Sequence, residues 1–251
     1  MPLPVISRKT PRPPLLFLYG TSGIGKTTLA ASFPGGLILP VEQGADTMDA
    51  PRLPAPATWG EAMDLIDRVI AEPTGVHALT IDSVTALQRL CVAETCALNG
   101  GARSIELIGG GWGKGWRFAL DLWLTLLARL ESLRSVGVGV LLIGHVEIKR
   151  YDDPRSEGYD RFQPRLQKEI LAATIEQSDA LLFANYAVFT DKEGNRNRAV
   201  GGGVRTLYCN EQPTHLAKNR YSLPDELPME WPGIFAGIAA AFRPAAAQVS
   251  P

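Results

Sequence analysis

The sequence predicts an α/β protein built on one mostly parallel sheet, with helices on both of its faces and antiparallel strands near the C-terminus. Four short apolar runs alternate with segments of helical periodicity, a pattern typical of strands that are buried on both faces. A glycine-rich segment directly follows the first run. Two later strand-like runs flank the turn-forming residues 191–195. The predicted strands span 15–19, 36–41, 77–81, 138–144, 180–190 and 204–210.

Composition narrows the class of protein. The chain has 251 residues, of which 45% are hydrophobic and 20% charged, with a formal charge of −1. This is ordinary for a globular protein and argues against a strongly basic nucleic-acid coat protein. Three cysteines with no CxxC spacing predict neither a disulfide scaffold nor a zinc site. With no apolar run long enough for a signal peptide or a membrane span, we expect a reduced, cytoplasmic setting and no membrane partner.

We expect one folded domain with a short extension at each end. Residues 1–13 contain four prolines and three cations and are interpreted as a flexible basic arm. Residues 14–243 are predicted to form a single domain, and residues 244–251, rich in Pro, Ala and Ser, a frayed tail.

Helices are expected between the strands. A short helix should follow the glycine-rich segment, from 27 to about 32. Thr58 with Glu61 forms a capping box that opens a helix ending near residue 71. Two further helical stretches are predicted over 84–98 and 117–135, the second from leucines recurring at helical spacing.

The segment after the first strand matches the phosphate-binding pattern GxxxxGK[ST] at every fixed position. Glycines let the backbone wrap phosphates closely, and successive N–H groups at a helix N-terminus bind anions. We expect Lys26 to neutralise the β- and γ-phosphates of ATP and the Thr27 hydroxyl to bind Mg²⁺. The alternative is a glycine-rich turn with a chance lysine. The predicted nucleotide-binding residues are Gly20, Thr21, Ser22, Gly23, Ile24, Gly25, Lys26, Thr27 and Thr28.

Asp82 is the candidate for the acidic group that such a site requires near its metal. It follows the apolar strand 77–81, and α/β sheets bind their ligands at the carboxyl ends of strands. We therefore expect Asp82 to hold Mg²⁺ through water. The alternative is that Asp82 merely caps the helix that begins near Val84.

Two further polar residues are predicted at the same edge. Glu42 follows the second strand, where its carboxylate could act as a base or orient water for hydrolysis. His145 closes the fourth strand and is a candidate sensor of the γ-phosphate. A solvated loop glutamate and a structural histidine are the respective alternatives.

Together these residues resemble the RecA-like ATPases: the GTSGIGKTT segment, Glu42, the Asp82-Ser83 pair, and a polar residue closing the next core strand. That family typically has glutamine where this chain has His145. Downstream, Lys218 and Arg220 resemble the Lys-x-Arg element of hexameric RecA-like helicases, which reaches a neighbouring subunit's γ-phosphate. On a strand, residues two apart project to the same side. The resemblance thus implies a homo-oligomer with nucleotide at the subunit interface, and a surface basic cluster is the alternative.

More narrowly, over about residues 14–235, the chain resembles phage-encoded, RecA-core-only ATP-binding proteins of the AAA type. Some members of that group are single-strand annealing recombinases. The resemblance rests on the TIDSVTAL, GWGKGW, LLIGHVEIKR and AKNRYSLP segments. It implies recombination or annealing of single-stranded DNA, a bacterial host cytoplasm and a single-strand binding protein as a partner.

Two segments are candidates for DNA contact. The first mixes glycines, indoles and cations, which suit backbone contact, base stacking and phosphate pairing. The second carries interleaved cations and aromatic rings with a net charge of about +2. A glycine-rich helix connection and a mixed-charge surface hairpin are the alternatives. The candidate residues are Trp112, Lys114, Trp116 and Arg117 in the first segment and Lys149, Arg150 and Arg161 in the second.

Two other functions remain open. In one, ATP acts only as a conformational switch for a DNA-annealing protein, without fast turnover. In the other, the chain is a P-loop nucleotide kinase, in which Arg155, Arg161 and Arg165 would form the arginine-rich lid. The downstream Lys218 and Arg220 fit a kinase poorly.

Overall fold

A computed structural model of the chain describes residues 10–44, 48–153, 157–193 and 196–243, with the backbone alone over the strand residues between 188 and 202. Most of the predicted arm and the whole predicted tail lie outside the described residues. Arg12, at the arm's end, pairs with Glu131 at 2.7 Å, and the carbonyl of Pro13 accepts a hydrogen bond from Arg134. Residues 12 and 13 are therefore attached to the domain.

The described residues form a nine-stranded sheet in the order β2-β3-β4-β1-β6-β7-β9, with β5 on β4 and β8 on β6. The first five strands of this order are parallel, and the later pairings are antiparallel. The α/β class, with a mostly parallel sheet and late antiparallel strands, is thereby confirmed. The strands are β1 Leu15–Gly20, β2 Gly36–Pro40, β3 Ala78–Asp82, β4 Gly139–Tyr151, β5 Tyr159–Pro164, β6 Ala180–Glu193, β7 Arg196–Tyr208, β8 Lys218–Asn219 and β9 Glu226–Pro228.

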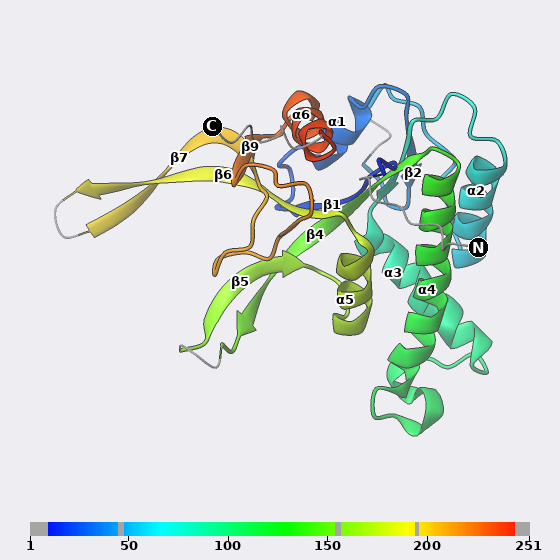
Figure 1. Cartoon of the computed structure of the whole chain (residues 1–251). Helices are drawn as coiled ribbons and strands as arrows, with labels where there is room; N and C mark the ends of the chain where they lie inside the picture. The colour runs from blue at the N-terminus through cyan, green and yellow to red at the C-terminus, as the bar shows by residue number, and fades with distance from the viewer. Residues whose placement is uncertain (1–9, 45–47, 154–156, 194–195, 244–251) are drawn as a thin grey trace, which may run out of the picture.

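Helices cover both faces of the sheet, as the sequence predicts (Figure 1). Helices α1 and α6 pack on one face, where the Trp231 indole donates to the carbonyl of Leu29 at 2.7 Å. Helices α2 to α5 pack on the other. The helices are α1 Lys26–Ala31, α2 Trp59–Ala71, α3 Val84–Leu98, α4 Lys114–Ser135, α5 Lys168–Gln177 and α6 Trp231–Ala241, with a 3₁₀ segment, η2, at Ile105–Gly110.

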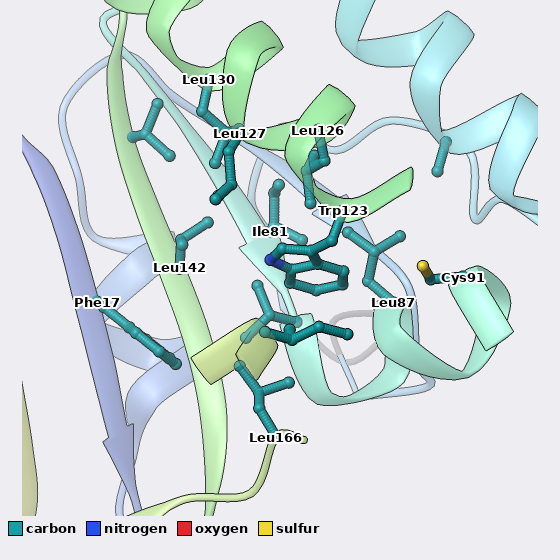
Figure 2. Packing of buried hydrophobic residues seen from close by; sticks show 14 of the residues in the cluster. Phe17, Ile81, Leu87, Cys91, Trp123, Leu126, Leu127, Leu130, Leu142 and Leu166 are labelled. Carbon is teal, nitrogen blue, oxygen red and sulfur yellow. The ribbon is translucent and has the colours of Figure 1, made fainter. Parts of the chain in front are cut away.

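The strands supply both cores because side chains alternate between the two faces. Phe17 of β1 packs toward α4, whereas its neighbours Leu16 and Leu18 pack toward α1 and α6. Figure 2 shows the larger core, in which Trp123 of α4 lies over Ile81 of the sheet. The Trp123 indole nitrogen is not left unpaired, since it donates to the hydroxyl of Thr174 at 2.9 Å. Burial on both faces explains why the strands are so uniformly apolar.

Several boundaries differ from the predicted ones. Strand β4 does not end near residue 144 but runs on to Tyr151 and pairs with β5, which forms the hairpin that the sequence offered as an alternative for this segment. Strand β7 begins at Arg196 rather than 204 and passes through three glycines. Of the predicted turn, residues 191–193 belong to β6, and residues 194 and 195 lie outside the described residues. Helices α5 and α6 were not predicted.

None of the described helices is long and apolar enough to span a membrane.

Candidate functional site

The predicted phosphate-binding loop (residues 20–27, hereafter the P-loop) connects the end of β1 to the start of α1. Gly20 lies so close to the backbone of β6 that a β-carbon there would collide with the carbonyl oxygen of Ala184. Gly25 precedes α1 with φ of 101°, in the left-handed region that favours glycine. Both glycines are therefore required by the backbone path.

Lys26 is buried, with 7% of its surface exposed. Its ammonium group donates to the carbonyl oxygens of Gly20 and Thr21 at 3.0 and 2.9 Å. Burial lowers its pKa, and the nearby Asp82 and Glu42 charges oppose that effect. Within the described part of the chain no carboxylate lies at ion-pair distance from this ammonium group. The positive charge is therefore held in place but not neutralised.

Thr27 and Asp82 meet across the loop. The Thr27 hydroxyl donates to Asp82 Oδ2 at 2.6 Å, and Asp82 is the last residue of β3. The alternative role as a helix cap is wrong, because Ser83 caps α3 by accepting from the Ala86 N–H. Burial is the main cause that raises the pKa of Asp82.

This donor set fits Mg²⁺, which is bound by few protein oxygens together with substrate phosphates. Both Thr27 and Asp82 line the cavity beside Lys26, where phosphate oxygens could complete the coordination of the metal. No group of three or more His, Cys, Asp or Glu able to hold a metal occurs among the described residues. Thr27 and Asp82 would therefore hold Mg²⁺ jointly with a nucleotide.

Glu42 and His145 form a pair beside this site. His145 Nε2 lies 2.8 Å from Glu42 Oε1, and both side chains are about a quarter exposed. The hydrogen bond from His145 is the main cause that lowers the pKa of Glu42. His145 does not end its strand, since β4 continues beyond it, but it pairs in register with Gly20. It therefore lies at the sheet edge where the P-loop begins.

These side chains surround one cavity of about 280 Å³. The structure thus brings together the predicted phosphate, metal and hydrolysis residues from the P-loop and α1, the end of β3, β4 and the segment after β2. The cavity is lined by Ser22, Gly23, Gly25, Lys26, Thr27, Thr28, Glu42, Gln43, Met48, Asp82, Ile143 and His145.

Lys218 and Arg220 do not join this cavity. They lie beside the start of β6, at the amino end of the parallel strands, whereas the P-loop lies at the carboxyl end. Both reach the same side, as predicted, and both donate to the carbonyl of Glu176 at the end of α5. Cations are favourable at helix C-termini, so within one chain these residues stabilise α5.

In the first candidate segment for DNA contact, three of the four predicted side chains are exposed and one is hydrogen-bonded within the chain. Trp112 is 97% exposed and has φ of 59° between glycines that also have positive φ. Lys114 and Arg117 are exposed on the first turn of α4. The Trp116 indole, in contrast, donates to Glu106 Oε1 at 2.8 Å and is half-buried. Only Trp112 therefore presents both faces of its ring to solvent.

The second DNA candidate is the β4–β5 hairpin. Lys149 and Arg150 are exposed on its outer part. Arg161 is half-buried: it stacks 4.0 Å over the Tyr151 ring and pairs with Glu211 at 3.1 Å. The role of Arg161 in DNA contact therefore stays a prediction, and such a contact would compete with the Glu211 pair.

Sequence reasoning missed one residue at the P-loop. Arg205 of β7 extends over the loop, so that a β-carbon added at Gly25 would lie 2.5 Å from its Nη1. Arg205 also lines a second cavity, of about 590 Å³, beside α1. No local motif marks this arginine, because 180 residues separate it from the loop and only the β6–β7 hairpin brings it there.

Comparison with known proteins shows the family to which the chain belongs. The model of an AAA domain matches residues 12–221, and the chain belongs to this family. Among solved structures, it is similar to a KaiC-like protein from the hyperthermophilic archaeon Pyrococcus horikoshii OT3, with 14% identity over 80% of each chain and a TM-score of 0.40. No curated protein matches. The family match and the site together define a P-loop NTPase of the AAA type, built on a mostly parallel sheet.

Proposed function

We propose that this protein is a Mg-ATP-dependent ATPase that acts on single-stranded DNA in recombination or annealing of the phage type. The observation that carries the ATPase part is the convergence of Lys26, Thr27, Asp82 and Glu42 on one cavity. Each supplies a different requirement of phosphoryl transfer: a cation, a hydroxyl and a carboxylate for the metal, and a carboxylate for water.

Each side chain has a defined task. Lys26 would exchange its two carbonyl contacts for phosphate oxygens, which are stronger acceptors because they are charged. Bound Mg²⁺ supplies further neutralisation of the phosphate oxygens. Glu42 is ionised, since the hydrogen bond from His145 lowers its pKa, and it can accept a proton from the attacking water.

Trp112 is the observation that favours single-stranded DNA as the other ligand. An almost fully exposed indole, held out by a glycine-rich loop, offers a stacking face that any base can use. Lys114 and Arg117 lie beside it and can pair with phosphates. The β4–β5 hairpin, with Lys149 and Arg150, offers a second basic surface. Stacking contributes about 1–3 kcal/mol per base.

The deciding experiment is the Mg-ATP hydrolysis rate titrated with single-stranded and duplex DNA at low and moderate salt. We expect stimulation by single strands alone, weaker at higher salt because phosphate contacts release counterions. Trp112→Ala should weaken single-strand binding about tenfold or more, whereas Trp112→Phe, which keeps an aromatic face, should retain most of it. Equal response to duplex DNA, or full binding by Trp112→Ala, would count against the DNA part.

The proposal includes a homo-oligomer in which Arg220 reaches a neighbour's nucleotide. Arg220→Ala should then bind ATP normally but lose hydrolysis, as expected for a cation that stabilises transition-state charge. Its contact with the end of α5 supports a second, purely structural role. In that case the variant hydrolyses ATP normally and its melting temperature falls slightly. Hydrolysis and melting measured on the same preparation separate the two roles.

Two alternatives have their own readouts. If ATP acts only as a switch, Glu42→Gln should anneal complementary strands as well as the wild type does. If the protein is a nucleotide kinase, it should transfer phosphate to a nucleoside monophosphate. The pairing of Arg161 with Glu211 disfavours the kinase, because that arginine is not free to act in a lid.

A further inference from the structure

The second cavity adjoins the phosphate cavity at the first turn of α1. Gly25 and Thr28 line both cavities. The two spaces therefore lie on either side of the same helical turn, with the metal-binding carboxylate in one and not in the other. At about 590 Å³ the second cavity is within the size range of small-molecule sites, and its walls are mostly apolar.

Arg205 stands where the two cavities meet. Its guanidinium contacts the P-loop at Gly25, and the carbonyl of Arg205 accepts a hydrogen bond from the Met229 N–H, which ties β7 to the segment before α6. Arg205 is exposed, and in the described part of the chain its guanidinium has no carboxylate partner. A free cation against an anion-binding loop points to a further phosphate contact.

Helix α6 supplies the opposite wall. The Trp231 ring is buried and anchored to the Leu29 carbonyl, which fixes α6 against α1. Phe235 stacks on Trp231 with ring centroids 5.4 Å apart and meets Phe33 edge-on at 5.5 Å. Yet 38% of Phe235 remains exposed. Its ring is thus held rigidly while part of it is left uncovered beside the cavity, an arrangement suited to stacking on a planar group.

We infer that this second cavity holds the nucleoside of the bound nucleotide, with the base against Phe235 and with Arg205 on the phosphate nearest the nucleoside. A triphosphate chain whose far end lies at Asp82 and Glu42 must leave the P-loop past Gly25 and Thr28, and that path leads into this cavity. The inference rests on the proposed nucleotide site. It adds that Arg205 and Phe235, about 180 and 210 positions after Gly25, complete the site within the same chain.

The test compares equilibrium binding of ATP and of inorganic triphosphate to the full chain by calorimetry. We expect the wild type to bind ATP at least tenfold more tightly than triphosphate, because only ATP fills the second cavity. Phe235→Ala should reduce this ratio below threefold and leave triphosphate affinity unchanged. Arg205→Ala should weaken binding of ATP about tenfold. Arg68→Ala, which removes an exposed arginine on α2 outside both cavities, is the matched control.

Thermal melting monitors folding, and Phe235→Leu replaces Phe235→Ala if the latter unfolds, since leucine preserves packing but not the aromatic face. Equal affinity of the wild type for ATP and triphosphate would overturn the inference, as would an unchanged ratio in the Phe235 variants. The proposed function fails separately: in that case Lys26→Ala and the wild type bind ATP equally weakly. Loss of ATP binding in Lys26→Ala alone, with an unaltered ratio in Phe235→Ala, rejects only the second cavity.

Discussion

Charged side chains are buried at both ends of the parallel strands, which we call the amino edge and the carboxyl edge of the sheet. The hydrogen-bond partners of these charges differ between the two edges. At the amino edge, Asp179 accepts from Arg134 at 2.6 Å, from the Leu15 N–H at 3.0 Å and from the Tyr221 hydroxyl at 3.0 Å. Arg134 in turn donates to the carbonyl of Pro13 at 2.7 Å. Every polar contact that these two buried groups need comes from the chain itself.

At the carboxyl edge, the contacts are incomplete. Among the described residues, the ammonium group of the buried Lys26 donates to two backbone carbonyls and has no carboxylate at ion-pair distance. The difference separates a charged group that holds the fold together from one that awaits an anion. Substitutions at the two edges should therefore fail in different ways.

The largest effect is expected at the amino edge. Arg134→Met leaves Asp179 buried without its main partner, which costs about 3–5 kcal/mol of stability. Urea denaturation should show this loss, while ATP affinity of the folded fraction stays unchanged. A loss below about 1 kcal/mol would mean that Arg12 and Arg220, which lie 3.7 and 3.5 Å from Asp179, can replace Arg134.

Lys26→Ala should show the opposite pattern. ATP binding should weaken about a hundredfold or more, equivalent to about 2.7 kcal/mol. Stability should remain constant or rise, because the substitution removes a buried cation without a carboxylate partner. Calorimetric titration with ATP and a denaturant curve on the same protein check both parts. A marked loss of stability would show that the lysine also supports the P-loop fold.

Glu42→Gln tests the hydrolysis step within the carboxyl edge. We expect kcat to fall about a hundredfold because the amide cannot accept a proton from water. The Kd for ATP should change less than threefold, since the contacts to Lys26 and Thr27 remain. Single-turnover hydrolysis and binding together provide the measurement. An unaltered rate would exclude Glu42 as the base.

The smallest effect is a shift in pH dependence. The His145 hydrogen bond lowers the pKa of Glu42, so the carboxylate stays ionised, and its stabilising contact is retained, until pH falls through that lowered value. His145→Ala removes this bond, and the acid limb of the kcat profile should move to higher pH. His145→Asn, whose amide can still donate, should move it less. Identical pH profiles of kcat for the wild type and both variants would show that His145 does not control the ionisation of Glu42.

Much of this site could be predicted because its signals are local. The P-loop pattern lies within eight consecutive residues, and Asp82 and Glu42 each follow an apolar run. Once the strands are parallel, their carboxyl ends share one edge, which brings these residues together. The capping box at Thr58 is confirmed for the same reason, since Thr58 accepts from the Glu61 N–H.

Other features depend on contacts between distant parts of the chain and leave no local pattern. Arg205 reaches the P-loop because β7 pairs with β6, whereas the five residues before it are glycines and valines and form no motif. In the sequence, Trp116 looks like a ring available for stacking and Arg161 like a cation available for phosphate. In the structure, Trp116 donates to Glu106 and Arg161 pairs with Glu211. Helix α5 is short, and its stability derives from packing and from Lys218 and Arg220 at its end.

Strand β4 joins two parts of the molecule in one continuous element. It passes His145 at the nucleotide edge and continues for six residues to Tyr151, a distance of about 20 Å at the usual rise of a strand. Antiparallel pairing with β5 from Val146 to Tyr151 stiffens this stretch (Figure 1). A rigid rod of this kind transmits a tilt at one end as a larger sweep at the other. A displacement of β4 at His145 would thus become a larger displacement at Tyr151.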